Sequence, residues 1–147
     1  MAQPTTKIGI ELELYTRILA RLRTIDGKDP YYFDFKNNLG ISFLSVEQVD
    51  HFPYLCFGEF VIGSSVPAPR NKFEYSITVD VWAYTESESD PLGAALKALS
   101  DLRIAFGSEE SFTDILTKPS FGASCGASGT VGVSIFTISG TLEYILT

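Results

Sequence analysis

One short run of small residues has the spacing of a hydrolase nucleophile. Residues 122–126, Gly-Ala-Ser-Cys-Gly, match the pattern G-x-S-x-G, in which a sharp turn between a strand and a helix exposes a nucleophilic serine. That chemistry also needs an acid and a histidine later in the chain. The one histidine, His51, precedes Ser124, and a strand-like run rather than a helical one follows. The sequence therefore favours a small-residue loop over residues 122–129, with no catalytic serine.

The cysteines and the histidine also lack the spacing of a metal site or of a nucleophile with its base. Structural zinc takes four ligands at short regular spacings, and the chain has only Cys56, Cys125 and His51. A cysteine nucleophile would need His51 beside Cys125, and no oxyanion-hole feature accompanies the two. We expect Cys56 to be a small core residue and both thiols to be reduced. A Cys56–Cys125 disulfide is the alternative.

Acidic residues gather in three places without the spacing of a calcium loop. The groups are Asp26/Asp29, Glu86/Glu88/Asp90 and Glu109/Glu110/Asp114. Two carboxylates can serve glycosidic chemistry only at a suitable separation in space, and solvated turns or helix N-termini are the more common reason for such groups. The chain also has no Walker loop or dinucleotide-binding glycine pattern. We therefore expect no enzyme activity, no metal and no cofactor.

Length and composition are those of one globular domain, which we assign to residues 1–147. The chain has 147 residues, of which 45% are hydrophobic and 20% charged. Its 11 basic and 18 acidic residues give a net charge of −7. This balance argues against nucleic acid as the main partner, because phosphate binding needs a basic footprint. No apolar run is long enough to span a membrane, and the polar residues 1–6 lack an apolar signal region, so we expect folding in the cytosol.

Two segments have helical periodicity. The first is residues 8–22, capped by Thr5 or Thr6 and ending near Arg23. Its expected apolar stripe is Ile8, Leu12, Tyr15, Leu19 and Leu22, widened by Ile18. Its basic residues form either a local patch or a solvated face, the latter favoured by a Glu13–Arg17 pair at i,i+4. The second helix begins at Asp90 and Pro91 and ends at Gly107. Its expected stripe is Leu92, Ala95, Leu96, Leu99, Leu102 and Phe106.

The other segments predict strands, turns and loops. Residues 31–35 and 41–45 suggest an aromatic hairpin, and residues 53–62 a buried strand in which Gly58 marks a bulge or a close backbone approach. Residues 73–84 alternate most clearly, with two aromatics on the polar face, and are long enough to extend beyond the core. Residues 130–146 form a last strand, with a bend or a bulge at Gly140. We expect an α+β fold: a mainly antiparallel four- to five-stranded sheet with two main helices packed on one face.

Four successive segments have counterparts in a known family. These are the helix at residues 8–22 with the aromatic segment 31–35, the Asp-x-x-Pro entry at Asp50 and Pro53, the alternating strand 75–84, and the helix at residues 90–104 with its Ala/Leu stripe. This arrangement resembles the tail-terminator, or tail-completion, proteins of long-tailed bacteriophages. The loops at residues 66–70 and 122–129 have no counterpart that we can map.

The resemblance implies a structural virion protein, without catalysis or cofactor, that is assembled in the bacterial host cytoplasm. Such proteins form a hexameric ring that caps the head-proximal end of the tail tube, ends tube polymerisation and connects the tail to the neck or head. The implied partners are copies of the chain, the tail tube protein and a neck or head-completion protein. DNA would pass through the lumen without specific binding, and the acidic composition suits such a wall.

The candidate ring or tube interface is the loop at residues 63–72 with the ends of its flanking strands, chosen for its length and its Pro/Gly content. Its residues are Ser64, Val66, Pro67, Pro69, Arg70, Lys72, Trp82 and Tyr84. A surface loop without a partner is the alternative. Two rival functions remain: a head-completion, neck or other tail-associated protein of similar fold, and a small-ligand-binding or peptide-binding domain. In the latter, a pocket would be lined by Tyr31, Tyr32, Trp82 and Tyr84.

Overall fold

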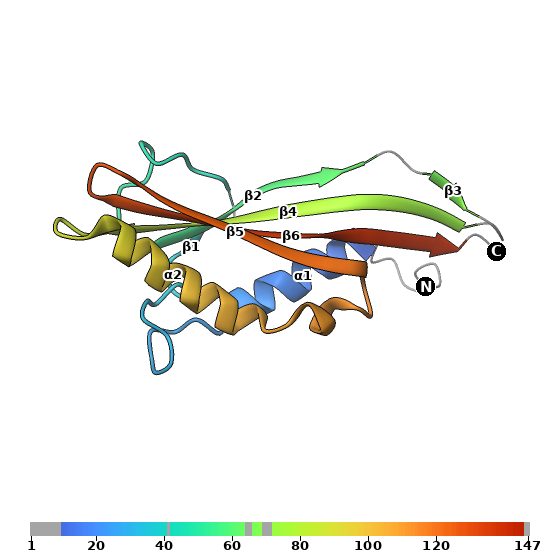
Figure 1. Ribbon diagram of the computed structural model, residues 1–147, viewed down its shortest axis with the longest axis horizontal. Coiled ribbons are helices and arrows are strands. Elements are labelled where there is room, and N and C mark those ends of the chain that lie inside the picture. Colours follow the sequence, from blue (N-terminus) through green and yellow to red (C-terminus); the bar gives the residue numbers. More distant parts are fainter. Residues whose placement is uncertain (1–9, 41, 64–65, 69–71, 146–147) are drawn as a thin grey trace.

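The computed structural model has an α+β architecture built on one mixed sheet (Figure 1). It describes residues 10–40, 42–63, 66–68 and 72–145. The elements in chain order are α1 (Ile10–Leu22), β1 (Leu39–Gly40), β2 (Tyr54–Ile62), β3 (Val66–Ala68), β4 (Lys72–Glu86), α2 (Pro91–Phe106), the 3-10 helix η1 (Glu109–Phe112), β5 (Thr117–Ser128) and β6 (Val131–Ile145). The expected α+β class is confirmed.

The sheet has the strand order β1-β2-β4-β6-β5, and β3 pairs with β4 outside this order. The pair β1–β2 is parallel, whereas the pairings of β2, β3 and β6 with β4, and of β5 with β6, are antiparallel. The sheet is therefore mixed. Its centre is the pair β4–β6, which stays in register from Lys72↔Ile145 to Glu86↔Val131. In Figure 1 these two strands continue past the first turn of α1.

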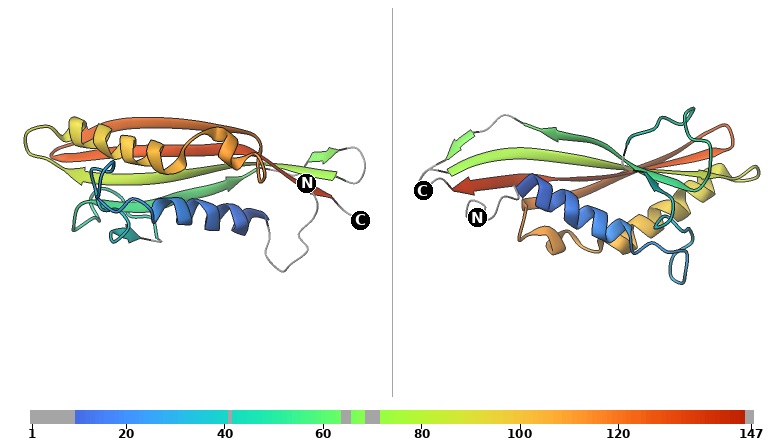
Figure 2. Two further views of the ribbon diagram at one scale, coloured as in Figure 1. Left: turned by 90° about the horizontal axis from the view of Figure 1, so that it is seen from below. Right: turned by 180° about the vertical axis from the view of Figure 1, so that it is seen from behind.

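Both helices contribute to one cluster of buried side chains together with β2, β4 and β6. Figures 1 and 2 draw α1 and α2 on the same side of the sheet. The expected inward face of β4 is confirmed over its central part, where Ile77, Val79, Val81 and Ala83 are all buried. A second, smaller cluster contains Val49, Tyr54, Cys56 and Tyr84, with Trp82 packed against it.

The helix boundaries match the sequence better than the buried faces do. α2 begins at Pro91 with Asp90 as its N-cap, whose Oδ1 accepts a hydrogen bond from Gly93 N at 3.0 Å, and Gly107 ends it. The predicted stripe was wrong at Leu92 and Leu96, which are exposed, while three alanines of this helix are buried. The helix lies so close to β6 that a Cβ at Gly132 would come within 3.0 Å of the Ala95 Cβ. Small residues are therefore the ones that fit against the sheet.

The buried face of α1 agrees with the predicted stripe at Ile18 and Leu22, and differs from it at Leu12. Its buried residues are Ile10, Leu14, Ile18 and Leu22, and Leu12 is exposed. The helix is apolar on two neighbouring stripes, so periodicity alone did not show which one meets the sheet. The helix ends at Leu22, as expected. The proposed capping residues Thr5 and Thr6, with Ile8, lie outside the described residues.

The predicted aromatic hairpin was wrong. Residues 31–35 form no strand, because the backbone N–H groups of Tyr32 and Phe33 each donate to the Asp101 carboxylate at 2.9 Å. A lone bridge joins Asp26 and Asp34. The expected return strand over residues 41–45 is also absent from its described residues 42–45. The strand in this region is instead β1, which joins the sheet in parallel.

The two long loops predicted at residues 63–71 and 122–129 both contain strand. β3 pairs with the first residues of β4, and residues 122–128 belong to β5, which runs antiparallel to β6 through a tight turn at Gly129 and Thr130. A bulge, one of the two alternatives expected at Gly58, lies between Phe57 and Phe60. The bulge expected at Gly140 lies on the opposing strand, where register shifts between Thr117 and Ser120.

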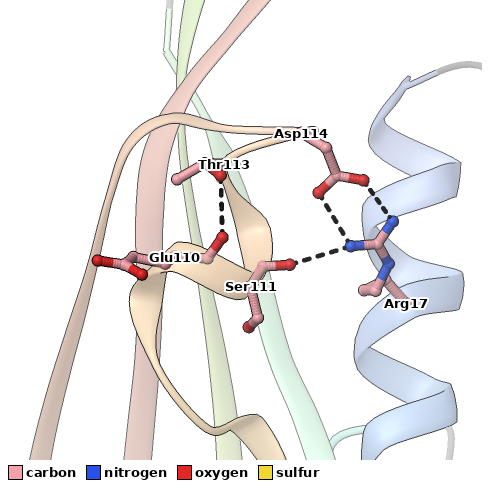
Figure 3. A network of polar contacts seen from close by, with 5 residues as sticks. All are labelled: Arg17, Glu110, Ser111, Thr113 and Asp114. Carbon is pink, nitrogen blue, oxygen red and sulfur yellow. Dashed lines mark hydrogen bonds and ion pairs between the residues drawn. The ribbon is translucent and has the colours of Figure 1, made fainter.

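The basic residues of α1 are occupied by contacts within the fold. The Arg17 guanidinium donates to both carboxylate oxygens of Asp114 and to the Ser111 carbonyl (Figure 3). Arg21 Nη1 donates to the Ala105 and Phe106 carbonyls at 3.4 and 3.5 Å, at the C-terminal end of α2. The close ion pair of Arg17 is therefore with Asp114. The Glu13 charge, predicted to pair with Arg17, adds a smaller contribution to the raised pKa of Arg17.

Candidate interaction site

The G-x-S-x-G run does not form a nucleophile elbow. Ser124 lies within β5, opposite Ile135 of β6, instead of at a turn between a strand and a helix. His51 lies in the segment before β2, where its Nδ1 is 2.9 Å from the Asp50 carboxylate. The backbone geometry on which the motif depends is therefore missing at Ser124.

The two thiols have different surroundings and are both free. Cys56 is fully buried on β2, as predicted, and burial raises the pKa of its thiol. Cys125 lies on β5, with its sulfur 3.5 Å from Ser134 Oγ.

Across the ranges that the structure covers, no three His, Cys, Asp or Glu side chains gather as a metal site.

The predicted interface residues fall into three groups. Ser64, Pro69 and Arg70 lie outside the described residues. Val66 and Pro67 belong to β3, and Lys72 begins β4, so a short strand pair occupies part of the predicted loop. Trp82 and Tyr84 are the third group and lie on β4.

Trp82 and Tyr84 both contribute to the sheet side that carries the segment before β2. Tyr84 is fully buried and its hydroxyl donates to the Leu44 carbonyl at 2.7 Å. The Trp82 ring meets Phe43 edge to face, with 5.2 Å between ring centroids. Tyr32 lies elsewhere, beside α2, where Lys97 Nζ is 5.6 Å from its ring centroid. Tyr31 packs against the larger core cluster, whereas Trp82 and Tyr84 belong to the second one, so the four aromatic residues predicted to line one pocket do not come together.

A cavity of about 340 Å³ lies beside Trp82. It is lined by Phe43, Gly58, Glu59, Val61, Asp80 and Trp82. The Asp80 carboxylate accepts a hydrogen bond from Thr137 Oγ1 at 2.8 Å. The sequence indicated two parts of this site, the bulge at Gly58 and the outward aromatic Trp82. It gave no signal for Phe43, which reaches the cavity from a loop.

Within the described residues, the sheet has an unpaired strand edge on each of its two sides. β5 pairs with β6 on one side, and within the described chain no strand pairs with its other side. At the opposite edge, the described residues of β1 pair with β2 at Leu55 and Cys56. Beyond this short cover β2 ends in two exposed apolar residues, Val61 at 54% and Ile62 at 48% exposure. Among the residues that the structure describes, no strand therefore pairs with the outer side of β2 along its second half.

A shallow apolar groove runs along the outer side of α2. It is lined by Leu96, Leu99, Ser100, Arg103 and Ile104. The exposed side chain of Leu92 lies one turn before Leu96 on the same helix. This face combines large apolar side chains with solvent exposure, which is typical of surfaces that contact other proteins.

None of the helices within the described ranges has the length and apolar character to cross a bilayer. A scan against protein-family models gives no match to this chain, and a search of curated proteins also finds none.

Proposed function

We propose that this chain is a structural subunit of a phage virion. It forms a hexameric ring at the head-proximal end of the tail tube, ends tube polymerisation and connects the tail to the neck. In this proposal the two helices cover one face of the sheet and leave its edges to neighbouring subunits. The observation that carries the proposal is the open edge of β5.

The β5 edge has few of the features that keep sheet edges from pairing. Edge strands are usually short, or carry charges, prolines or bulges. β5 has 12 residues, and its charge, proline and bulge all lie at its start, at Lys118 and Pro119. From Phe121 to Ser128 it consists of one aromatic and seven small uncharged residues. Among the described residues no strand pairs with the outer side of this stretch, and its side chains are mostly small, so a neighbouring strand could bond to its backbone.

The uncovered part of β2 supplies the complementary edge. A contact between β5 of one subunit and β2 of the next joins two different surfaces, and such contacts close into a ring when the rotation between subunits allows it. The exposed side chains of Val61 and Ile62 would then be covered by the neighbour. The acidic balance of the chain suits a ring whose lumen lets DNA pass without gripping its phosphates.

The test is the native mass of the purified protein, followed by electron microscopy for sixfold annuli. The edge is tested with the double variant Ala123→Lys/Ala127→Lys, because charged lysines on an edge oppose strand pairing. Its control, Ser89→Lys/Ser108→Lys, adds the same charge at exposed turn residues. We expect rings from the wild type and the control, and folded monomers from the edge variant.

Two results would contradict the proposal. A wild-type protein that stays monomeric at every concentration and also turns over a substrate rules out a structural ring. Rings formed equally well by the edge variant exclude β5 as the contact. A head-completion or neck protein would also form rings, and imaging the neighbouring rings in an assembled particle distinguishes the two positions.

A further inference from the structure

We propose that the cavity beside Trp82 binds the cationic end of an arginine or lysine side chain presented by a partner protein. Three features support this assignment: a bulge that turns an acidic side chain outward, an aromatic wall, and carboxylate oxygens that have no cationic partner among the described residues. The inference goes beyond the proposed ring and rests on the geometry of one subunit.

The bulge in β2 sets the acidic side of the cavity. Phe57 pairs with Val81 and Phe60 with Val79, so Gly58 and Glu59 together face the single residue Asp80. Strict alternation from Phe57 would turn Glu59 toward the helices. The extra residue resets the alternation, so Phe60 packs against the core and Glu59 is exposed at the cavity. A bulge that re-aims a side chain in this way is often found beside functional sites.

Gly58 lets the Trp82 ring lie directly against the β2 backbone. A Cβ at this position would stand 2.8 Å from the indole Nε1 and 3.1 Å from the Asp80 Cβ. With only hydrogen at Gly58, the indole stays at the wall of the cavity, and Phe43 stands edge-on to it. Trp is the aromatic side chain that attracts cations most strongly, and planar guanidinium groups also stack on it.

The polar groups of the cavity also suit a cationic guest. Glu59 has no hydrogen-bond or ion-pair partner among the described residues, and Asp80 accepts its one observed side-chain bond, from Thr137, through Oδ1 only. Two carboxylates therefore keep free acceptor capacity beside an aromatic face. A guanidinium has five N–H donors and no acceptor, so it matches this lining, whereas an anionic guest would be repelled.

The size of the cavity favours one side chain as the guest. Its volume of about 340 Å³ is at the lower end of the range typical of small-molecule sites. The cavity also lies next to the uncovered part of β2, so a protein approaching that edge could place a basic side chain in it.

The chain contains one tryptophan, so the Trp82 indole N–H gives a single resonance that reports on the cavity. The experiment titrates dilute ¹⁵N-labelled protein with N-acetyl-arginine amide, with N-acetyl-lysine amide and with the neutral N-acetyl-glutamine amide. We expect saturable shifts of the indole resonance with at least one of the cationic compounds and none with the glutamine compound. Raising the NaCl concentration should weaken the binding.

The variant Glu59→Gln removes one charge from an exposed position and should not impair folding. We expect it to weaken binding of the cationic compound roughly two- to fivefold, as for an exposed ion pair. The control Glu88→Gln, in the turn before α2, should bind as the wild type does. Equal shifts with the neutral compound, no shift with either cation, or unchanged binding by Glu59→Gln would each overturn the inference. None of these results depends on ring formation, so they leave the proposed function untouched.

Discussion

Arg17 of α1 and Asp114 lie 97 residues apart in the chain and form a two-point ion pair. Arg17 Nη1 donates to Oδ1 at 3.1 Å, Nη2 donates to Oδ2 at 2.8 Å, and Nη1 also reaches the Ser111 carbonyl at 3.1 Å (Figure 3). The pair connects the first helix to the segment between η1 and β5. The hydrogen bond from Arg17, partly opposed by desolvation, holds the pKa of Asp114 below its usual value.

We predict that Asp114→Asn lowers the free energy of unfolding at pH 7 by about 0.2–1 kcal/mol, the range for exposed ion pairs. The expected loss of stability is small because 62% of the Asp114 side chain is exposed to solvent, which weakens the ion pair. Because the folded pKa lies below the unfolded one, the contribution is present above the ordinary pKa of 3.8 and is lost as pH falls through the folded value. Urea unfolding at several pH values should show the wild type and the variant converging in acid. A difference that persists unchanged in acid would contradict this.

We predict a larger effect for Asp101→Asn. The Asp101 carboxylate is fully buried and accepts the N–H groups of both Tyr32 and Phe33. An asparagine keeps one acceptor oxygen, so one N–H would face an NH₂ group. The expected loss is about 1–3 kcal/mol in urea unfolding, the cost of an unsatisfied buried donor. Hydrogen exchange at the Tyr32 or Phe33 amide should also become faster. The exposed control Glu109→Gln should change neither quantity, and an equal loss in both variants would refute the explanation.

Local signals in the sequence were enough to predict several elements. The Asp90-Pro91 start and the Gly107 end of α2 depend on capping within a few residues, and the strand alternation around Val79 and Val81 is also local. Such patterns determine the local structure without contacts to distant residues, so they can be recognised from the sequence. The glycine at position 58 is also a local signal, and the bulge was one of the two alternatives that it indicated.

The errors arose where a distant residue decides the local structure. Residues 31–35 have strand-forming side chains, but Asp101 captures two of their N–H groups from 69 and 68 residues away. Conversely, the small residues of β5 have low strand propensity, and they form a strand because β6 pairs with them. For this reason the sequence predicted only some of the residues that line the candidate cavity. The strand pattern indicated an outward Trp82, and the glycine indicated an irregularity at Gly58. The position of Phe43 and the outward direction of Glu59 depend on the folded chain.

We predict that Gly132→Val disrupts the contact between α2 and β6. A Cβ at this buried position would lie 2.4 Å from the Pro91 carbonyl oxygen and 2.8 Å from Thr85 Oγ1. Because the first of these atoms is backbone, the helix must move, and overpacking of this kind costs about 1–3 kcal/mol. The control Gly126→Val adds the same side chain where nothing lies within 4 Å. Thermal unfolding should show a lower midpoint for Gly132→Val than for the control, and equal midpoints would show that α2 can shift freely.

We predict that Tyr84→Phe loosens the segment that carries Phe43. Burial raises the pKa of the Tyr84 hydroxyl, which stays protonated and donates to the Leu44 carbonyl at 2.7 Å. Losing this bond leaves the carbonyl without that donor and should cost about 1 kcal/mol in chemical unfolding.

The same substitution should also change the surroundings of Trp82 in the cavity. Leu44 follows Phe43 in the chain, and the Phe43 ring stands edge-on to Trp82. We therefore expect Tyr84→Phe to change the emission of Trp82, the only tryptophan in the chain. The matched control is Tyr54→Phe, since Tyr54 is also buried in the second cluster and its hydroxyl has no hydrogen-bond partner among the described residues. If both variants lose the same stability and change the emission equally, the bond to Leu44 does not hold this segment in place. If only Tyr84→Phe loses stability and changes the emission, that bond positions the aromatic wall of the cavity.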